Sequence, residues 1–292
     1  MRIIIFTKSR AAQVELLLRS IKEQVCGWKD SLITVFHDFD DREYGRGYSL
    51  LKEIHPEFHY YERDHKKSLK EQLRELISME KKDFFSFFVD DLVVIRPFSK
   101  EDKQFKILKE RKDIMFLSSR LNPNINYSQP LSMKVYAPNL DSDMVFCVKK
   151  TNFGYFLERN IISRLLRKNG FRIFMPLRGD WGCQMSIDGN IYRYEEFREY
   201  FNSLPEFSYV PDLEEIMMKH PLSGSKVIIY PESRIVNIAS NKVDKIFLYY
   251  PSAGEDPLAI NERFLNNGRL SYDHLKSLNN TSCHIETKLT WQ

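Results

Sequence analysis

Short apolar runs alternate with stretches of helical spacing along the first third of the chain. The apolar runs predict strands at residues 2–6, 32–36, 57–61 and 84–89. In the intervals, apolar side chains recur every three or four residues, which predicts helices at residues 14–25, 43–54 and 65–82. Strands that alternate with helices form βαβ units, and these predict a parallel sheet with a ligand crevice beyond the carboxyl ends of its strands.

The rest of the chain has a less regular pattern. Apolar runs predict further strands at residues 114–119, 143–149 and 225–240, the last ending in a turn. A helical stripe runs through Leu157, Ile161 and Leu165. A long stretch rich in Asn, Pro and Ser, residues 120–142, separates two of the strands. Loops of this length are uncommon inside compact domains and are usually functional or disordered.

Length and composition set the domain organisation. A chain of 292 residues with 42% hydrophobic content can bury a large core, as one large domain or as two closely packed lobes. No linker or internal repeat divides it. We therefore predict an α/β fold in a single large domain, with a mostly parallel central sheet flanked by helices. This domain spans residues 1–250, with halves at 1–98 and 99–250, and residues 251–292 form a helical tail packed on it.

The charge and the cysteine content of the chain restrict its possible ligands and its cellular compartment. The net charge of +4 comes from 44 basic and 40 acidic residues spread along the chain, so no basic stripe indicates a nucleic-acid binder. This balance is compatible with an anionic ligand or with peripheral contact to an acidic inner membrane face. The four cysteines form no CxxC pair, which argues against a zinc site and a disulfide framework. The N-terminal apolar run is too short for a signal peptide, and we expect a cytoplasmic protein.

Several common catalytic motifs are missing from the sequence. It contains neither GxGxxG nor GxxxxGK[ST], which argues against a dinucleotide oxidoreductase and a P-loop enzyme. The seven histidines show no HxH or HExxH spacing, so a histidine metal site is not indicated.

Carboxylates stand where two predicted strands end. Asp90 and Asp91 directly follow the apolar run "FFSFFV", and Asp38 follows the second strand. Adjacent strand side chains point to opposite faces, so Asp90 and Asp91 can face one ligand only where the strand ends. A DD pair is also common at turns and helix caps. Its position after the fourth strand favours a cation site, because Mg²⁺ and Mn²⁺ are often held by one or two carboxylates plus substrate phosphates.

Four short segments resemble one enzyme family. "FFVDDLVVIRPF" resembles the DxD-type segment of GT-A glycosyltransferases, in particular the E-D-D-L segment of inverting N-acetylglucosaminyltransferases. "IIIFTKSRAAQVELLLRSI" is similar to their first strand and helix, "RGDWGCQM" to their D-D-W segment, and "YPESR" to a P-E-x-S-R segment. Val89 stands where the family has Glu, and Gly179 replaces the first Asp of D-D-W. The matches span about residues 1–240.

The resemblance implies a GT-A fold, a nucleotide-sugar donor, most simply a UDP-sugar, and a saccharide or glycolipid acceptor. It assigns Mn²⁺ or Mg²⁺ to Asp91 and the catalytic base to Asp180, with Asp188 as the competing carboxylate. Residues 1–98 become the nucleotide-sugar half and residues 99–250 the acceptor half. The resemblance places the nucleotide at the end of the first strand, at Phe6 and Thr7, and the residue types suggest Arg10, Asp38 and Asp90 as further donor-binding residues.

Other interpretations stay open for single residues. Trp181 stands between glycines, which predicts an exposed ring that stacks on an acceptor sugar, although core packing is the usual role of Trp. Arg10 fits a diphosphate contact or a surface arginine near a helix start. Asp38 fits a nucleotide contact or a helix cap.

We therefore expect a metal-dependent, inverting glycosyltransferase of surface polysaccharide biosynthesis, similar to bacterial enzymes of that kind. Two alternatives remain open. A sugar-phosphate nucleotidyltransferase also places an Asp-bound metal beside a parallel sheet. A non-catalytic protein of the same fold would bind a glycan or a partner.

Overall fold

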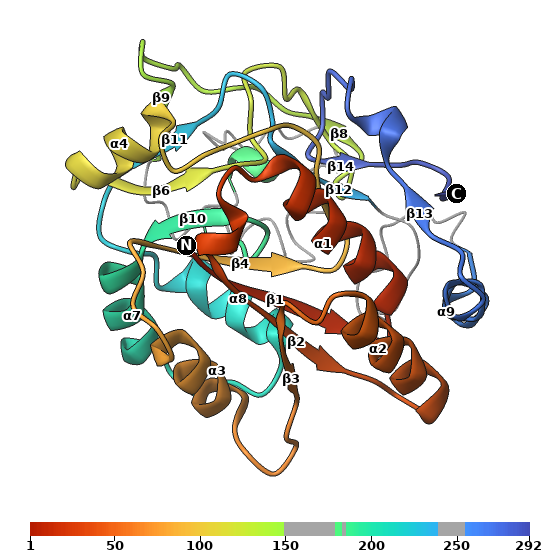
Figure 1. Cartoon of the computed structure of the whole chain (residues 1–292). Helices are drawn as coiled ribbons and strands as arrows, with labels where there is room; N and C mark the ends of the chain where they lie inside the picture. Colours follow the sequence, from red (N-terminus) through yellow and green to blue (C-terminus); the bar gives the residue numbers. More distant parts are fainter. Residues whose placement is uncertain (149–178, 183–184, 239–254) are drawn as a thin grey trace, which may run out of the picture.

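The computed structural model describes residues 1–148, 179–182, 185–238 and 255–292 (Figure 1). The predicted order of elements in the first third is confirmed. The strands are β1 (Arg2–Lys8), β2 (Leu32–Asp38), β3 (His59–Glu62) and β4 (Phe84–Val89). The helices between them are α1 (Ala11–Gln24), α2 (Arg42–Ile54) and α3 (Leu69–Ser78).

The middle of the chain contains more elements than its pattern predicts. The helices are α4 (Lys103–Glu110), α7 (Tyr194–Ser203) and α8 (Val210–Lys219), with a 3-10 turn, η2 (Gly179–Trp181). The strands are β5 (Leu92–Val94), β6 (Ile114–Ser118), β7 (Tyr127–Ser128), β8 (Met133–Lys134), β9 (Val145–Cys147), β10 (Asn190–Arg193), β11 (Lys226–Ile229) and β12 (Ile235–Ile238). The single strand predicted at 225–240 is wrong, because the turn at "PES" splits it into β11 and β12. The helical stripe through Leu157 lies outside the described residues.

The main sheet has eight described strands in the order β3-β2-β1-β4-β10-β6-β11-β9. Neighbouring pairs among β3, β2, β1 and β4 are parallel, as are β6 and β11. β10 runs antiparallel to both of its neighbours, and β9 runs antiparallel to β11. The predicted α/β class with a mostly parallel sheet is therefore confirmed.

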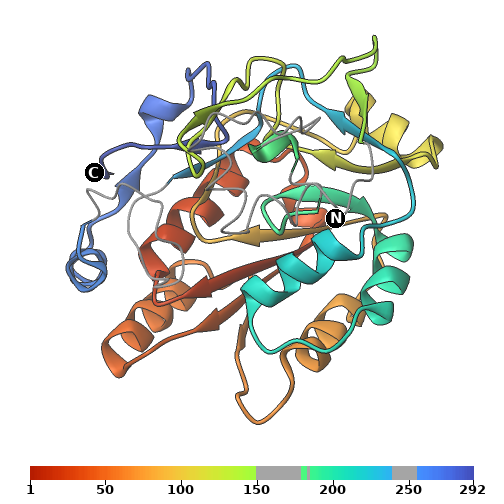
Figure 2. The same cartoon turned by 180° about the vertical axis from the view of Figure 1, so that it is seen from behind.

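The central position of β4 follows from its sequence. Phe84 and Phe88 pack into the core on one face of the sheet, and Phe85 and Phe87 pack into the core on the other. A strand that is apolar on both faces must be covered on both faces, which is the usual situation in parallel sheets. Helices α1 and α2 lie over the first face (Figure 1), and α3, α7 and α8 cover the opposite face (Figure 2).

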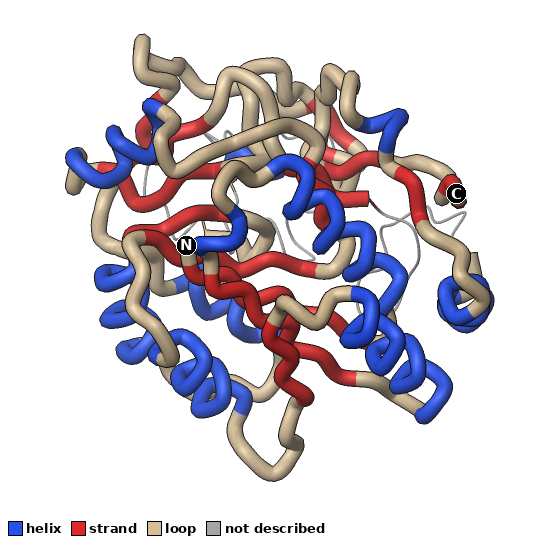
Figure 3. Tube along the Cα trace, viewed as in Figure 1, coloured by secondary structure: helices blue, strands red, loops and turns tan. Residues whose placement is uncertain are grey.

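A second, smaller sheet lies beside the end of β4 and joins distant parts of the chain. It has the order β14-β12-β5, with β14 (His284–Ile285) coming from the C-terminal segment. That segment also contains α9 (Pro257–Leu265), η3 (Asp273–Leu275), β13 (Leu270–Ser271) and β15 (Thr290–Trp291). Figure 3 shows that strands and loops make up much of this segment, with α9 at its outer edge. None of the described helices has both the length and the hydrophobicity needed to cross a bilayer.

Candidate functional site

The carboxyl ends of β1, β2 and β4 meet at one edge of the main sheet. Lys8 lies opposite Asp38 in the β1–β2 register, and β4 ends beside β1 one residue before Asp90. The Asp90 carboxylate accepts from Arg10 Nη1 at 2.9 Å and from the backbone nitrogen of Lys8 at 3.3 Å. The turn after β1 and the turn after β4 are thus joined by one charge-assisted hydrogen bond.

Arg10 is held tightly at this edge. Its side chain is only 16% exposed and that of Asp90 only 9%. Burial alone would lower the pKa of the Arg10 guanidinium, but Asp90 and Asp91 more than offset this and raise it. Arg10 therefore remains a fixed positive charge at the mouth of the crevice, with its guanidinium directed at Asp90.

Asp91 reaches a different set of partners because β5 starts directly after it. β12 pairs antiparallel with β5, which places Asn237 opposite Leu92. The Asn237 amide donates to Asp91 Oδ1 at 3.0 Å, and the backbone nitrogen of Ile238 donates to the Asp91 carbonyl at 2.7 Å. On its other side, Asn237 lies opposite His284 of β14. The small sheet thus aligns Asp91, Asn237 and His284 across three segments.

Arg120 lies beside the two other candidate carboxylates, Asp180 and Asp188. Its Nη1 lies 3.1 Å from Asp188 Oδ2 and 3.8 Å from Asp180 Oδ1, and it donates to Asn237 Oδ1 at 2.6 Å. The Arg120 side chain is 6% exposed, so these pairs lie in a largely desolvated setting. Since Asn237 also bonds Asp91, one continuous polar network links both predicted base candidates to the predicted metal ligand.

Asp180 is the more enclosed of the two base candidates, with a side chain that is 7% exposed against 17% for Asp188. Its Oδ1 lies 3.6 Å from His284 Nδ1, whereas its buried Oδ2 has no hydrogen-bond partner among the described residues. Burial lowers the pKa of the His284 imidazole even though the Asp180 carboxylate opposes the shift, so His284 is neutral at pH 7.

The electrostatics of Asp91 fit a cation ligand. Burial and the nearby charges of Asp188 and Asp90 together raise the pKa of Asp91 to about 7, although Arg10 and Asn237 act in the opposite direction. A divalent cation at this carboxylate would relieve that repulsion, and oxygen ligands suit Mg²⁺ and Mn²⁺. In the described ranges no three His, Cys, Asp or Glu side chains gather closely enough to hold a metal ion.

Two glycines fix the segments that carry Asp180 and Asp188. Gly189 has φ +73°, and a Cβ there would lie 3.0 Å from Ser119 Oγ. Gly179 has φ +58°, and a Cβ there would lie 2.7 Å from the Cβ of Ser128 in β7. A side chain at position 179 would collide with β7, so this turn requires glycine there.

The side chains of Phe6 and Thr7 do not face the crevice. Phe6 is 5% exposed and packs in the core, 4.9 Å from the ring of Phe87. The Thr7 hydroxyl bonds the Tyr48 hydroxyl of α2 at 2.7 Å. Strand alternation turns these two side chains toward the two cores, so only their backbone is available to a ligand, and their role in donor binding stays a prediction.

Asp38 lies at the predicted edge, close to an arginine and a histidine. Its Oδ1 accepts from the backbone nitrogen of Phe39 at 2.9 Å and lies 3.1 Å from His65 Nε2. Its Oδ2 lies 3.5 Å from Arg63 Nη1. The carboxylate is thus anchored to the turns after β2 and β3, where its role in nucleotide binding stays a prediction.

The prediction of an exposed Trp181 is wrong. The side chain is 1% exposed, its indole nitrogen donates to the Ile125 carbonyl at 3.0 Å, and its ring packs edge-on against Phe146. The glycines beside it allow the turn η2 to fold Trp181 into the core, so its ring has no face to offer an acceptor sugar.

Trp181→Ala should therefore act on stability. Removal of a fully buried Trp leaves a cavity and typically costs about 3 to 5 kcal/mol of the free energy of unfolding. Urea denaturation followed by circular dichroism measures this loss. A variant with unchanged stability and weaker acceptor binding would instead restore the stacking role.

Arg120, Asn237 and His284 were not predicted as site residues. Each lies in a segment whose sequence carries no spacing motif, and they meet only through the pairing of β5, β12 and β14. The polar Asn237 inside the apolar run "RIVNIAS" was the one signal available, since a buried amide in a strand needs polar partners.

Comparisons with known proteins gave matches only among solved structures. No protein-family model matches the chain, and no curated protein sequence matches it. S. aureus TarS 1-349 aligns with 80% of this chain at 13% identity and a TM-score of 0.42. The mannosyltransferase PcManGT from Pyrobaculum calidifontis, in complex with GDP-Man and Mn²⁺, aligns with 85% at 11% identity and a TM-score of 0.41.

A third similar structure is glucosyl-3-phosphoglycerate synthase from Mycobacterium tuberculosis in complex with Mn²⁺ and UDP-Glc, at 12% identity, 78% coverage and a TM-score of 0.35. The chain spans 61% of the TarS 1-349 chain, 58% of the PcManGT chain and 67% of the synthase chain. Similarity at this level assigns no substrate, metal or acceptor to the present chain.

Proposed function

We propose that the chain is a metal-dependent glycosyltransferase that moves a sugar from a nucleotide-sugar donor to a saccharide acceptor with inversion of configuration, in the synthesis of a surface glycan. The observation that carries this proposal is the polar network at the carboxyl edge of the sheet. There Arg120 and Asn237 join Asp180 and Asp188 to Asp91, beside the turn that holds Arg10 and Asp90.

The turns that follow β1 and β4 would bind the donor. The backbone from Thr7 to Arg10 lies beside Asp90, whose carboxylate accepts from the backbone nitrogen of Lys8, and we assign the nucleoside diphosphate to this turn. Asp91 and the diphosphate oxygens would hold the cation, which supplies charge stabilisation to the leaving group. Arg10, fixed by Asp90, places a positive charge at the same end of the crevice.

The acceptor half of the reaction needs a base on the face opposite the leaving group. Asp180 Oδ2 has no partner in the described part of the chain, so it can accept the proton of an acceptor hydroxyl. Arg120 and the neutral His284 lie on its Oδ1 side and hold the carboxylate in place. Asp188 pairs more closely with Arg120, which suits a positioning role.

The loop at residues 121–142 would form one wall of the acceptor site. The loop is tied down near its start, where Leu121 and Ile125 are buried. Its tip is open, with Leu131 41% exposed and Tyr136 84% exposed. β7, inside this loop, packs on the turn that carries Asp180, as the closeness of Ser128 to Gly179 shows.

We expect donor plus Mn²⁺ to slow cleavage of this tip by chymotrypsin, because a wall of the acceptor site becomes ordered when the site fills. Tyr136→Ala identifies the cut made at the most exposed aromatic residue. Mn²⁺ without donor is the control and should leave the cleavage rate unchanged. Equal cleavage rates with and without saturating donor would show that the loop does not respond to the site.

Thermal unfolding with a panel of nucleotide sugars tests the proposed function. A ligand that binds only the folded state stabilises it, by about 2.7 kcal/mol at a concentration one hundred times its Kd. At least one nucleotide sugar should raise the melting temperature with Mn²⁺ and fail to do so with EDTA. A panel without any metal-dependent shift would count against the proposal.

A further inference from the structure

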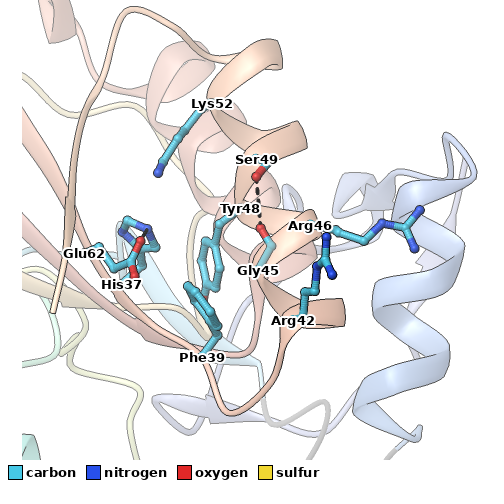
Figure 4. Close-up of a pocket in the computed structure, with 9 residues that line it drawn as sticks. All are labelled: His37, Phe39, Arg42, Gly45, Arg46, Tyr48, Ser49, Lys52 and Glu62. Carbon is cyan, nitrogen blue, oxygen red and sulfur yellow. Dashed lines mark hydrogen bonds and ion pairs between the residues drawn. The ribbon is translucent and has the colours of Figure 1, made fainter. Parts of the chain in front are cut away.

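A buried tyrosine holds the β1 turn in place from outside the crevice. Tyr48 of α2 is 1% exposed, and its hydroxyl shares a hydrogen bond with the Thr7 hydroxyl at 2.7 Å and accepts from the backbone nitrogen of Arg10 at 3.1 Å. Figure 4 shows Tyr48 beside Phe39 in the wall of a cavity of about 360 Å³ on the α2 side of the sheet. The donor side of the site is thus positioned by a residue that is itself too buried to contact a ligand.

A buried polar cluster, formed by Asn122, Ser233 and Asn280, lies next to Arg120 on the base side of the site. The three side chains are at most 3% exposed. The Ser233 hydroxyl accepts from Asn122 Nδ2 at 2.7 Å and from Asn280 Nδ2 at 2.9 Å. It donates to the backbone carbonyl of Arg120. A hydroxyl group has one donor and two acceptor sites, so the hydrogen-bonding capacity of Ser233 is fully used.

The cluster joins the three segments that bring the polar network together. Each member shares a short segment with one residue of that network, in the pairs Asn122 with Arg120, Ser233 with Asn237, and Asn280 with His284. Hydrogen bonds are directional, and a fully satisfied buried network specifies one arrangement of its members. The cluster therefore determines how these segments meet beside the candidate base.

The segment "YPESR" brings Ser233 to this position. It joins β11 of the main sheet to β12 of the small sheet. The backbone nitrogen of Arg234 donates to the Ser119 carbonyl at 2.8 Å, and the Arg234 guanidinium lies 4.6 Å from the centre of the Tyr230 ring. These contacts fix the turn against the end of β6, directly before Arg120.

Arg120 connects the cluster to the carboxylates. Ser233 holds its backbone carbonyl, whereas its guanidinium lies 3.1 Å from Asp188 and 3.8 Å from Asp180 and donates to Asn237. The Arg120 side chain is buried along its length, so it has little freedom to compensate for a shift of its backbone. A displacement at the Arg120 carbonyl is therefore passed on to both base candidates.

We propose that Ser233, supported by Asn122 and Asn280, is a positioning residue that sets the Arg120 guanidinium between Asp180 and Asp188. Ser233 acts through the backbone of Arg120 and is not itself a catalytic residue. The inference rests on the proposed function, because the carboxylates that Arg120 orients are the candidate base and its competitor.

Ser233→Ala tests the inference by structure and by kinetics. It removes the donor to the Arg120 carbonyl and the shared acceptor of the two amides. In crystal structures of the wild type and the variant, the Arg120 guanidinium should move by more than about 0.5 Å, the tolerance of a productive site. In steady-state kinetics, kcat should fall at least about tenfold while the donor KM changes less than about twofold, because a misplacement of about 1 Å can cost 10²-fold in rate.

Ser20→Ala is the matched control. Ser20 is as buried as Ser233, and its hydroxyl donates to the Leu17 carbonyl at 2.8 Å and accepts from the backbone nitrogen of Val94 at 3.1 Å. Its loss should lower the free energy of unfolding by a similar amount and leave kcat unchanged. Asn280→Asp keeps the size of the side chain but loses the donor to Ser233, and it should lower kcat in the same way if Ser233→Ala does not fold.

Three results would overturn the inference. An Arg120 guanidinium that stays in place in Ser233→Ala would remove the positioning role, whatever the activity. A fall in kcat that Ser20→Ala reproduces would make the cluster a source of stability only. A donor KM that rises as much as kcat falls would place the effect at donor binding. A wild-type protein without transferase activity would overturn the proposed function instead, and the crystal structures would still decide whether Ser233 sets the position of Arg120.

Discussion

Replacing Asp180 with asparagine is expected to lower turnover by about 10²- to 10⁴-fold, the usual contribution of general base catalysis. Asparagine keeps the shape of the side chain but cannot accept the proton of the acceptor hydroxyl. Donor affinity should stay nearly unchanged, because Asp180 lies on the Arg120 and His284 side of the network and not at the β1 turn. Steady-state kinetics separate the two effects as a fall in kcat with an unchanged donor KM.

Asp188→Asn is the matched control for that prediction. Asp188 is the closer ion pair of Arg120, at 3.1 Å, and its side chain is 17% exposed. Its replacement should lower turnover much less than Asp180→Asn does. Near-normal turnover in Asp180→Asn together with a large loss in Asp188→Asn would transfer the base role to Asp188. A product that retains the donor's anomeric configuration would remove the need for either base.

Asp91→Asn is expected to abolish Mn²⁺-dependent donor binding while the fold stays intact. Asparagine keeps the oxygen that accepts from Asn237, so β5 and β12 should still pair. It removes the negative charge that a divalent cation needs. Donor titrations with Mn²⁺ and with EDTA measure this effect, and Asp90→Asn should weaken donor binding with a smaller change in the metal response.

The same substitution should raise the stability of the metal-free protein. The folded-state pKa of Asp91 is raised to about 7 by burial and by Asp188, so the carboxyl stabilises the fold when protonated, and this contribution is lost as pH rises from about 4 through 7. At pH 8 with EDTA, Asp91→Asn should therefore unfold at a higher urea concentration than the wild type. Lower stability together with unchanged metal-dependent binding would make Asp91 a structural residue.

The elements up to β4 could be predicted because they depend on local patterns. β4 is apolar on both faces, and Leu69, Leu73 and Leu76 of α3 recur on one helical face. These patterns predict a helix or a strand without knowledge of its neighbours. β10, β11 and β12 are only four residues long, and a turn separates the last two, so the pattern there could not distinguish one strand from two.

The site could be predicted only in part. Asp90 and Asp91 could be chosen as candidates because they follow a strand, and position after a parallel strand carries information about the ligand crevice. Arg120, Asn237 and His284 were missed because they reach the site by pairing across large sequence distances. Trp181 was misplaced because a glycine-flanked tryptophan looks exposed in sequence, whereas η2 turns it into the core.

The central claim is transfer from a nucleotide sugar, and the identity of the phosphorus product tests it most directly. The protein would be incubated with Mn²⁺, a panel of nucleotide sugars and candidate acceptors, and the products followed by ³¹P NMR. The account predicts release of a nucleoside diphosphate from at least one donor, lost with EDTA and in Asp91→Asn. Formation of a nucleotide sugar and pyrophosphate from a nucleoside triphosphate and a sugar phosphate, with no diphosphate released from any donor, would contradict it.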